Sequence, residues 1–212
     1  RLLKTNVSKL INVSPERIKT EILKIVNVEW NDSYWKTYLE LQLFKNWNED
    51  NINIITMVLN QKQSFSKEIK DGFPLARLIC LISDDGLSKL KFNKKQIQRC
   101  RTLRFWIRKI NNFGLEKFSE EQRFQLHVDL EEDLPSLMLF LKNEYVHEWL
   151  KRWKDPSDPL FHPSSPVNGY LLQKALMIPP GPSLGRLMRY LAKEKAFSRL
   201  FTNQEALQVA RK

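Results

Sequence analysis

The sequence predicts an all-α fold. Apolar residues recur at helical spacing along most of the chain, and no segment shows the strict alternation of a half-buried strand. Helix start signals, such as a serine before a proline or a capping box, precede several of these segments. Among 212 residues, 42% are hydrophobic, with six Trp and twelve Phe, which is enough to bury a core. We therefore expect a helical body followed by a small helical tail.

The first half of the chain contains four predicted helices. Ser14-Pro15 provides a serine cap and a proline at the first helical position, and an apolar stripe then continues at helical spacing to about Val28. Two further helices are expected over residues 33–46 and 51–60. Gly72-Phe73-Pro74 breaks the chain before an apolar helix over residues 75–83, which Asp84-Asp85-Gly86 is expected to end.

The net charge of +11 is concentrated in blocks. Residues 86–115 carry nine Lys and Arg and no Asp or Glu. A helix over about 93–111 would place an apolar arc on one side, formed by Cys100, Leu103, Trp106, Ile107 and Ile110. The basic residues expected on the opposite arc are Lys94, Arg101, Arg104, Arg108 and Lys109, whereas Arg99 falls within the apolar side. This pattern predicts a helix that buries one face and presents the other to phosphates.

A second interpretation of the basic block involves the segment that follows it. Residues 116–148 carry nine acidic and three basic side chains, so the basic helix could simply dock on this acidic stretch. We favour phosphate binding because an excess of basic side chains remains after the basic block is paired with this acidic stretch. The alternative from another functional class is a helical interaction module whose basic face docks an acidic protein.

The second half of the chain is also predicted to be helical. Ser119 has capping-box spacing to Gln122 and should begin a helix to about Leu130, and Pro135 should open a long helix to about Trp153. Four prolines between Pro156 and Pro166 then predict a semi-rigid connection. Short helices follow at about 168–176, 183–199 and 203–211, the last with a capping box from Thr202 to Glu205.

Signatures of enzymes are lacking in the sequence. Two Cys exclude a disulfide scaffold, and Cys80 and Cys100 fall on apolar helical faces typical of a core. The acidic clusters at Asp84-Asp85 and at residues 131–133 consist of adjacent residues, which do not face each other on a helix. The pair His127 and Asp129 could suggest a metal-dependent phosphohydrolase. This interpretation is the least favoured, because residues two apart on a helix point in different directions. The apolar runs are too short to span a membrane.

A glycine–proline motif near the C-terminus is more informative. Pro179-Pro180-Gly181-Pro182 fixes a turn directly before a helix, whose first N–H groups and dipole can seat a phosphate. Gly185 would permit close approach of a backbone, and Arg186, Arg189 and Lys193 share one helical face. The alternative is tight helix packing at Gly185 with the basic side chains merely solvated.

Two motifs resemble one family. The segment from Ser14-Pro15-Glu16-Arg17 through Glu21 to Ile25 is similar to the neck helix of class II tRNA nucleotidyltransferases and bacterial poly(A) polymerases. Residues 179–187, followed by Thr202, Glu205-Ala206-Leu207 and Ala210-Arg211, resemble the C-terminal end of that family. The connection from Trp153 to Gly169 is most similar to cyanobacterial members. The matches span nearly the whole chain, with residues 27–73 only weakly matched.

The resemblance implies a tRNA-binding region without its catalytic head. In the family, the head holds the Gly-Ser signature, the paired-aspartate Mg²⁺ site and the residues that select ATP or CTP, and none of these is present. We therefore expect the chain to follow such a head, in agreement with a first residue of Arg1 rather than Met. No cofactor is expected in the chain itself. The expected partners are tRNA and the head of the same protein, with no DNA or membrane, in bacterial cytoplasm or an organelle.

The resemblance also assigns roles to particular segments. Residues 1–154 would form the neck and body, 155–166 a proline-rich linker, and 167–212 the tail domain that grips tRNA. The neck residues expected to support the head structurally are Ser14, Pro15, Glu16, Arg17 and Glu21. The tail motif residues are Gly181, Pro182, Gly185 and Arg186. Contacts of the basic helix with tRNA follow from charge geometry and not from a family motif.

Overall fold

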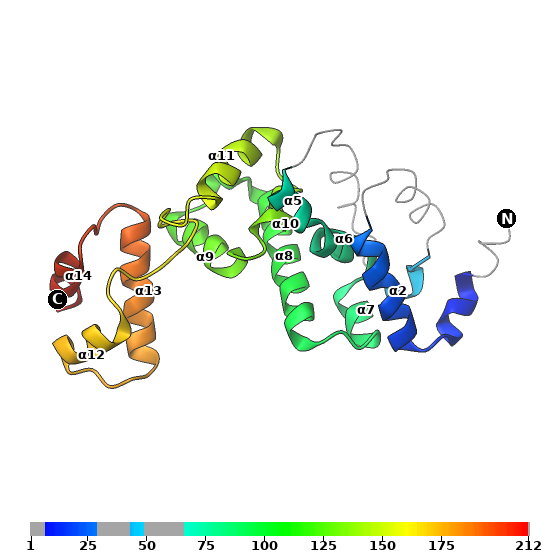
Figure 1. The fold of residues 1–212 in the computed structure, drawn as a ribbon, viewed down its shortest axis with the longest axis horizontal. Coiled ribbons are helices and arrows are strands. Elements are labelled where there is room, and N and C mark those ends of the chain that lie inside the picture. The colour runs from blue at the N-terminus through cyan, green and yellow to red at the C-terminus, as the bar shows by residue number, and fades with distance from the viewer. Residues whose placement is uncertain (1–6, 29–42, 49–65, 212) are drawn as a thin grey trace. The chain divides into compact units, whose positions relative to one another are not determined.

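The structure is a computed structural model that describes residues 7–28, 43–48 and 66–211. Within these ranges every regular element is helical and no strand occurs, so the predicted all-α class is confirmed (Figure 1). The helix expected over 51–60 lies outside the described residues. So does most of the helix expected over 33–46. Of its described residues, 43 and 44 form a turn, and 45 and 46 belong to the 3₁₀ helix η2 (Lys45–Trp47).

The chain divides into two compact units. The first comprises residues 1–109 and 132–146, and the second comprises residues 110–131 and 147–212. Two helices cross the division in sequence: α8 (Lys94–Phe113) and α11 (Asn143–Trp153). None of the helices within the described ranges is both long and apolar enough to cross a membrane.

The first unit is built around α2 (Pro15–Asn27) and α6 (Phe73–Leu81), which pack against each other. It also contains η1 (Val7–Asn12), α5 (Lys67–Asp71) and α10 (Leu134–Met138), and the last packs on α5 and α6. The predicted start of α2 at Pro15 is confirmed. The expected serine cap is not confirmed, because the Ser14 side chain makes no capping hydrogen bond. The local start signal is therefore Pro15, whose fixed φ suits the first helical position.

The acidic pair Asp84-Asp85 begins a helix and does not end one. Ser83 caps α7 (Asp84–Lys89) by accepting the N–H of Gly86 at 3.0 Å, and its hydroxyl donates to the carbonyl of Trp47 at 3.0 Å. A Cβ at Gly86 would overlap that same carbonyl oxygen, so only glycine fits at this position. The sequence analysis placed these two acids at the C-terminal end of a helix. They lie in the first turn of α7 instead, where the positive end of the helix dipole favours acidic side chains.

The long helix predicted from Pro135 to Trp153 is two helices. α10 ends at Met138 and α11 begins at Asn143, with turn hydrogen bonds from Phe140 N–H to Leu137 and from Leu141 N–H to Met138 between them. Every residue from 134 to 141 is buried. A continuous helix would have to cover all of its sides, whereas the break allows this apolar run to be enclosed.

The second unit contains α9 (Glu120–Leu130) and three tail helices: α12 (Gly169–Leu176), α13 (Pro182–Ala196) and α14 (Asn203–Ala210). The capping boxes predicted at Ser119 and Thr202 are both present. The tail helices enclose one apolar cluster, formed by Val167, Leu172, Leu184, Leu191, Leu200 and Ala206. α13 also packs on α9, which positions the polar contacts described below.

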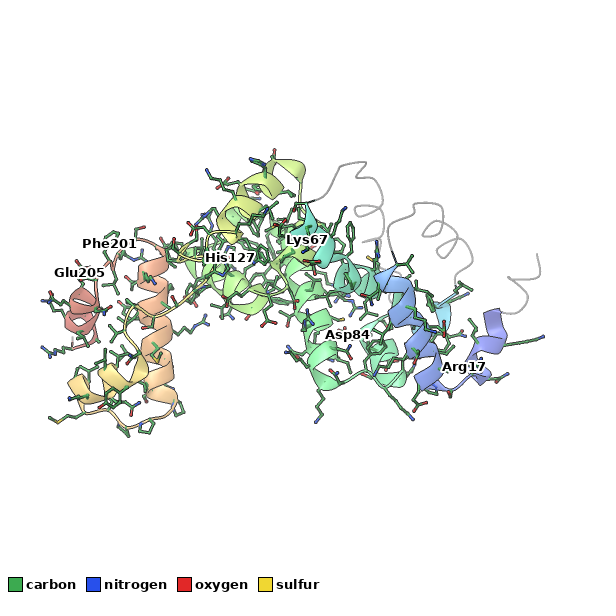
Figure 2. The ribbon with its side chains drawn as sticks, in the orientation of Figure 1. Arg17, Lys67, Asp84, His127, Phe201 and Glu205 are labelled. Carbon is green, nitrogen blue, oxygen red and sulfur yellow. The ribbon has the colours of Figure 1, made fainter. Side chains whose placement is uncertain are left out.

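The proline-rich segment of residues 155–166 is part of this second unit and is fixed by specific contacts. Arg152 donates to the carboxylate of Asp158 at 2.8 and 3.2 Å, and that carboxylate accepts the N–H groups of Leu160 and Phe161. The Phe161 ring is buried against His127 and Trp149, and Figure 2 labels His127 in this region. The segment is thus anchored by an ion pair and an aromatic cluster.

Candidate nucleic-acid interface

The basic helix forms as predicted and presents two different faces. α8 spans 20 residues and contains no acidic side chain. Its buried face includes the expected Cys100, Leu103, Trp106 and Ile107. The opposite face exposes Lys94, Arg101 and Arg108, with Lys109 partly exposed at its edge. A helix with cations on one side and apolar anchors on the other can hold a polyanion without losing its place in the fold.

Arg104 was expected on the exposed face, and this prediction was wrong. Only 1% of Arg104 is exposed, and its guanidinium forms an ion pair with Asp84 and donates to the backbone carbonyls of Ile79 and Ile82. On the helical wheel Arg104 lies at the edge of the apolar arc, and its long side chain turns inward to reach these acceptors. Arg104 therefore holds α8 to its neighbours and is not a candidate phosphate ligand.

Arg99 lies toward the apolar side, as the sequence predicted, and its charge is neutralised there. Its Nε donates to both carboxylate oxygens of Asp133, at 3.1 and 3.0 Å. This hydrogen bonding to the carboxylate raises the pKa of the Arg99 guanidinium. Of the acids between 116 and 148, Asp133 thus pairs with the buried side of α8 and not with its exposed face.

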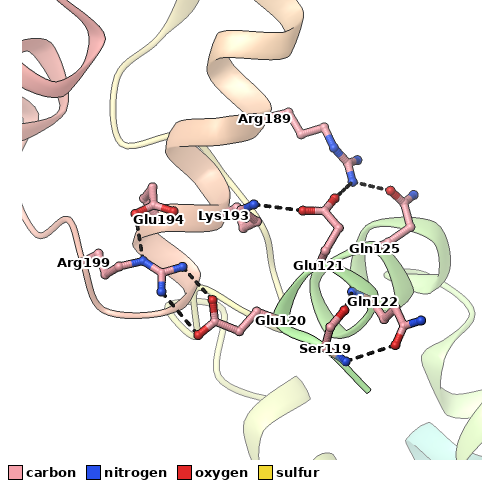
Figure 3. A network of polar contacts seen from close by, with 9 residues as sticks. All are labelled: Ser119, Glu120, Glu121, Gln122, Gln125, Arg189, Lys193, Glu194 and Arg199. Atoms are coloured by element: carbon pink, nitrogen blue, oxygen red, sulfur yellow. Dashed lines mark hydrogen bonds and ion pairs between the residues drawn. The ribbon is translucent and has the colours of Figure 1, made fainter. Parts of the chain in front are cut away.

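Two acids of that stretch, Glu120 and Glu121, pair with the tail. Arg189 and Lys193 on α13 both contact Glu121 on α9, at 3.0 and 2.9 Å, as Figure 3 shows. Arg199 pairs with Glu120 at 2.7 Å and with Glu194 at 2.8 Å. Acidic residues that the sequence offered as a dock for the basic block are thus engaged by cations of the tail. Arg189 and Lys193 help hold α13 against α9 through these pairs, and their expected contact with RNA stays a prediction.

The start of α13 remains open. Arg186 is exposed and donates to the Ser183 hydroxyl at 3.0 Å. Apart from the adjoining chain and, at Gly185, the backbone of α13 itself, no atom of the described residues lies within 4 Å of where a Cβ would stand at Gly181 or Gly185, so the alternative of tight helix packing at Gly185 is wrong. Gly181 has a φ of 156°, which disfavours a side chain. The turn and the first N–H groups of α13 are therefore accessible beside Arg186.

Residues of α2 contact Lys91, which lies just before the start of α8. Lys91 pairs with Glu16 at 2.5 Å, and Lys19 donates to the Lys91 carbonyl at 3.0 Å. The hydrogen bond from Lys91 lowers the pKa of the Glu16 carboxyl. Arg17 is exposed, and Glu21 pairs with Lys24 at 2.9 Å within the helix. Pro15 thus begins α2 and Glu16 links it to Lys91, and the expected support of a head by this motif stays a prediction.

Phe105 is a surface feature that the sequence analysis missed. The side chain is 52% exposed and lies on the cationic face of α8, four residues after Arg101 and three before Arg108. The ring of Trp106 meets it edge-on with centroids 5.1 Å apart, and the Lys109 ammonium lies 5.5 Å from its centroid. The signal was available, since the helical period places Phe105 among the basic residues and opposite the apolar arc.

Of the other titratable candidates, the two cysteines and His127 are core residues, and Asp129 is exposed. Burial raises the pKa of both the Cys80 and the Cys100 thiol to about 12, which keeps them protonated and unreactive. His127 is 3% exposed, and burial, with the charge of Arg152 adding to it, lowers its pKa to about 3. Over the ranges that the structure describes, no three His, Cys, Asp or Glu side chains gather in a group that could hold a metal ion.

Comparisons with models of protein families, with curated proteins and with solved structures found no match to this chain.

Proposed function

We propose that this chain is the tRNA-binding neck, body and tail region of a tRNA nucleotidyltransferase of the class II type. It would hold tRNA while a catalytic head, carrying Mg²⁺ and binding ATP or CTP, extends the 3′ end. The observation that carries the proposal is the exposed face of α8, where Lys94, Arg101 and Arg108 stand on a helix without acids. The order of the neck and tail motifs supports the same assignment.

The pairing of charges within the chain adds to this argument. Two acids of the stretch that follows the basic block, Glu120 and Glu121, are taken up by Arg199, Arg189 and Lys193 of the tail. Asp133 is taken up by Arg99 on the buried side of α8. The exposed cations of α8 stand on a helix without acids, with Asp84 of α7 3.5 Å from Arg101, and a phosphate backbone complements this concentration of positive charge. Such binding weakens steeply with salt. The open turn at Gly181 and Gly185 beside Arg186 supplies a second place for a phosphate.

The test is binding of the purified chain to an unmodified tRNA transcript across a salt series, with a poly(A) strand and a duplex RNA as controls. Arg101→Glu combined with Arg108→Glu should reduce affinity for tRNA more than tenfold at low salt and lower the salt slope by roughly one to two. Lys67→Glu combined with Lys70→Glu on α5 makes the same change in net charge and serves as the matched control. We expect that control to lose much less affinity.

Two outcomes would contradict the proposal. Equal binding to tRNA, poly(A) and duplex would indicate a generic polyanion surface. Absence of binding at low salt, together with capture of an acidic protein that tRNA does not displace, would favour an interaction module for protein. Competition by tRNA separates that module from an RNA-binding region, which salt dependence alone does not.

A further inference from the structure

The cationic face of α8 contains an exposed aromatic ring at its centre. Phe105 is 52% exposed although the same helix buries Trp106, Leu103 and Ile107 on its other side. About half of this large apolar side chain stays open to solvent, in the middle of a cationic face, where a ligand held by the cations could contact the ring.

The ring is held in place by its neighbours. Trp106 is only 1% exposed, so its position is fixed by the core, and its ring meets Phe105 at an interplanar angle of 78°. The ammonium of Lys109 lies 4.9 Å from the Trp106 centroid and 5.5 Å from that of Phe105. A ring oriented in this way by one aromatic edge and one cation is a preformed surface, which lowers the entropy lost on binding.

The chemistry around the ring selects the ligand. Arg101 and Arg108 lie one helical turn to either side of Phe105, so cations flank an aromatic face. A single-stranded nucleic acid has the complementary arrangement, with planar bases between phosphates, and aromatic side chains bind it by stacking. A duplex offers its phosphates but keeps its base faces covered by their neighbours. An acidic peptide would satisfy the cations and leave the ring without a planar partner.

We infer that Phe105 is a stacking platform for an unpaired base of RNA, with Arg101 and Arg108 on the phosphates to either side. The inference rests on the proposed RNA-binding function and adds to it that α8 contacts a single-stranded segment. Phosphate contacts supply salt-dependent affinity, whereas stacking supplies the preference for an unpaired nucleotide.

The experiment compares Phe105→Ala with wild type on a single-stranded RNA of about 12 nucleotides and on a blunt duplex of the same sequence. Phe105→Ala should weaken binding to the single strand by about tenfold, which corresponds to the loss of one stacked base. Binding to the duplex should change less than twofold, and the salt slope should stay the same because the phosphate contacts remain. Phe105→Trp should retain single-strand affinity, since it keeps a stacking face.

Phe113→Ala is the matched control, because Phe113 is 58% exposed on the same helix and its wheel position is turned away from Arg101 and Arg108. It should bind both RNAs as wild type does. Unchanged single-strand affinity in Phe105→Ala, with wild type binding well, would overturn the stacking role and leave the proposed function standing. Equal losses on both RNAs would also overturn it. Failure of wild type to bind any RNA would overturn the proposed function and this inference together.

Discussion

The guanidinium of Arg104 pairs with Asp84, joining α8 to the first residue of α7. The same guanidinium donates to the carbonyls of Ile79 and Ile82 at the end of α6, so a single side chain ties three helices together. Asp84 also lies 3.5 Å from Arg101, which is mostly exposed. The inner and outer cations of α8 thus share one carboxylate but differ in what they stabilise.

We predict that Arg104→Met lowers the free energy of unfolding by about 3 kcal/mol, because Ile79 and Ile82 lose a buried donor and Asp84 loses its inner partner. Urea unfolding followed by circular dichroism measures this change. Arg101→Met removes the exposed partner of the same carboxylate and should cost less than about 1 kcal/mol. Equal effects of the two substitutions would contradict the structural role given to Arg104.

Arg101 is exposed and Arg104 is buried, and the sequence predicted only the first of these two positions correctly. The helical period placed Arg101 and Arg108 outside correctly, but the sequence analysis counted Arg104 with them, although its wheel position borders Cys100 at the edge of the apolar arc. A long basic side chain at the edge of an apolar arc is buried only if hydrogen-bond acceptors lie on the buried side of the helix. Asp84 and the Ile82 carbonyl lie some twenty residues away in sequence, and no local pattern identifies them.

The same distinction holds for the fold. Local signals correctly located the capping boxes at Ser119 and Thr202 and the start of α2 at Pro15, because each depends on residues within one turn. The break between α10 and α11 depends on the burial of residues 134–141 from every side. The pairing of Glu121 with Arg189 joins residues 68 positions apart, which the charge blocks suggested only as a general attraction.

Gly86→Ala should be strongly destabilising. A Cβ at this position would overlap the carbonyl oxygen of Trp47 and lie 2.8 Å from its carbonyl carbon, and both are backbone atoms that cannot rotate away. The substitution must displace η2 from α7 and disturb the Ser83 cap, at a cost of about 2–3 kcal/mol. Thermal unfolding of the variant measures the cost. Wild-type stability would mean that Trp47 does not approach α7 as closely as the structure places it.

Gly185→Ala should act in the opposite direction. Gly185 is in the first turn of α13, and a Cβ there would meet no atom of the described residues within 4 Å. Replacing a helical glycine by alanine then stabilises by about 0.5–1 kcal/mol through the lower entropy of the unfolded chain. The same measurement made for Gly86→Ala applies. A loss of stability would reveal a neighbour packed against this turn.

Acid should destabilise the chain through His127. Burial lowers the pKa of its imidazole to about 3, against 6.5 for the unfolded chain. Between these values the unfolded state binds the proton and the folded state does not, so the stabilisation is complete above about pH 6.5 and declines as the pH falls. By pH 4.5 the loss should approach about 2–3 kcal/mol.

Urea unfolding of the wild type and of His127→Leu at pH 7, 6, 5 and 4.5 tests this dependence. Carboxyl groups begin to titrate at the low end of this range, and because both proteins contain them, the difference between the two slopes isolates His127. His127→Leu should remove most of the slope between pH 7 and 5, because it removes the titrating imidazole. It breaks no hydrogen bond of Nδ1, since that atom has no partner among the described residues. His147 is exposed, and His147→Gln should leave the slope as it is. A slope that persists in His127→Leu would assign the acid sensitivity to other groups.

Glu121→Gln should strengthen RNA binding if the proposed function holds. The Glu121 carboxylate pairs with Lys193 and Arg189, and these contacts lower its pKa, so it is ionised at neutral pH. Its neutral isostere removes the negative charge that faces two cations of α13, on the side of the tail that also carries Gly185, while Arg189 keeps its hydrogen bond to Gln125. We expect affinity for tRNA to rise a few-fold at low salt, and the salt slope to steepen by roughly one for each phosphate gained.

Glu116→Gln removes one exposed charge from the segment just before α9 and is the control. Equal gains in both variants would mean that only net charge matters, whereas a gain confined to Glu121→Gln would identify Arg189 and Lys193 as cations that the ion pairs hold in reserve.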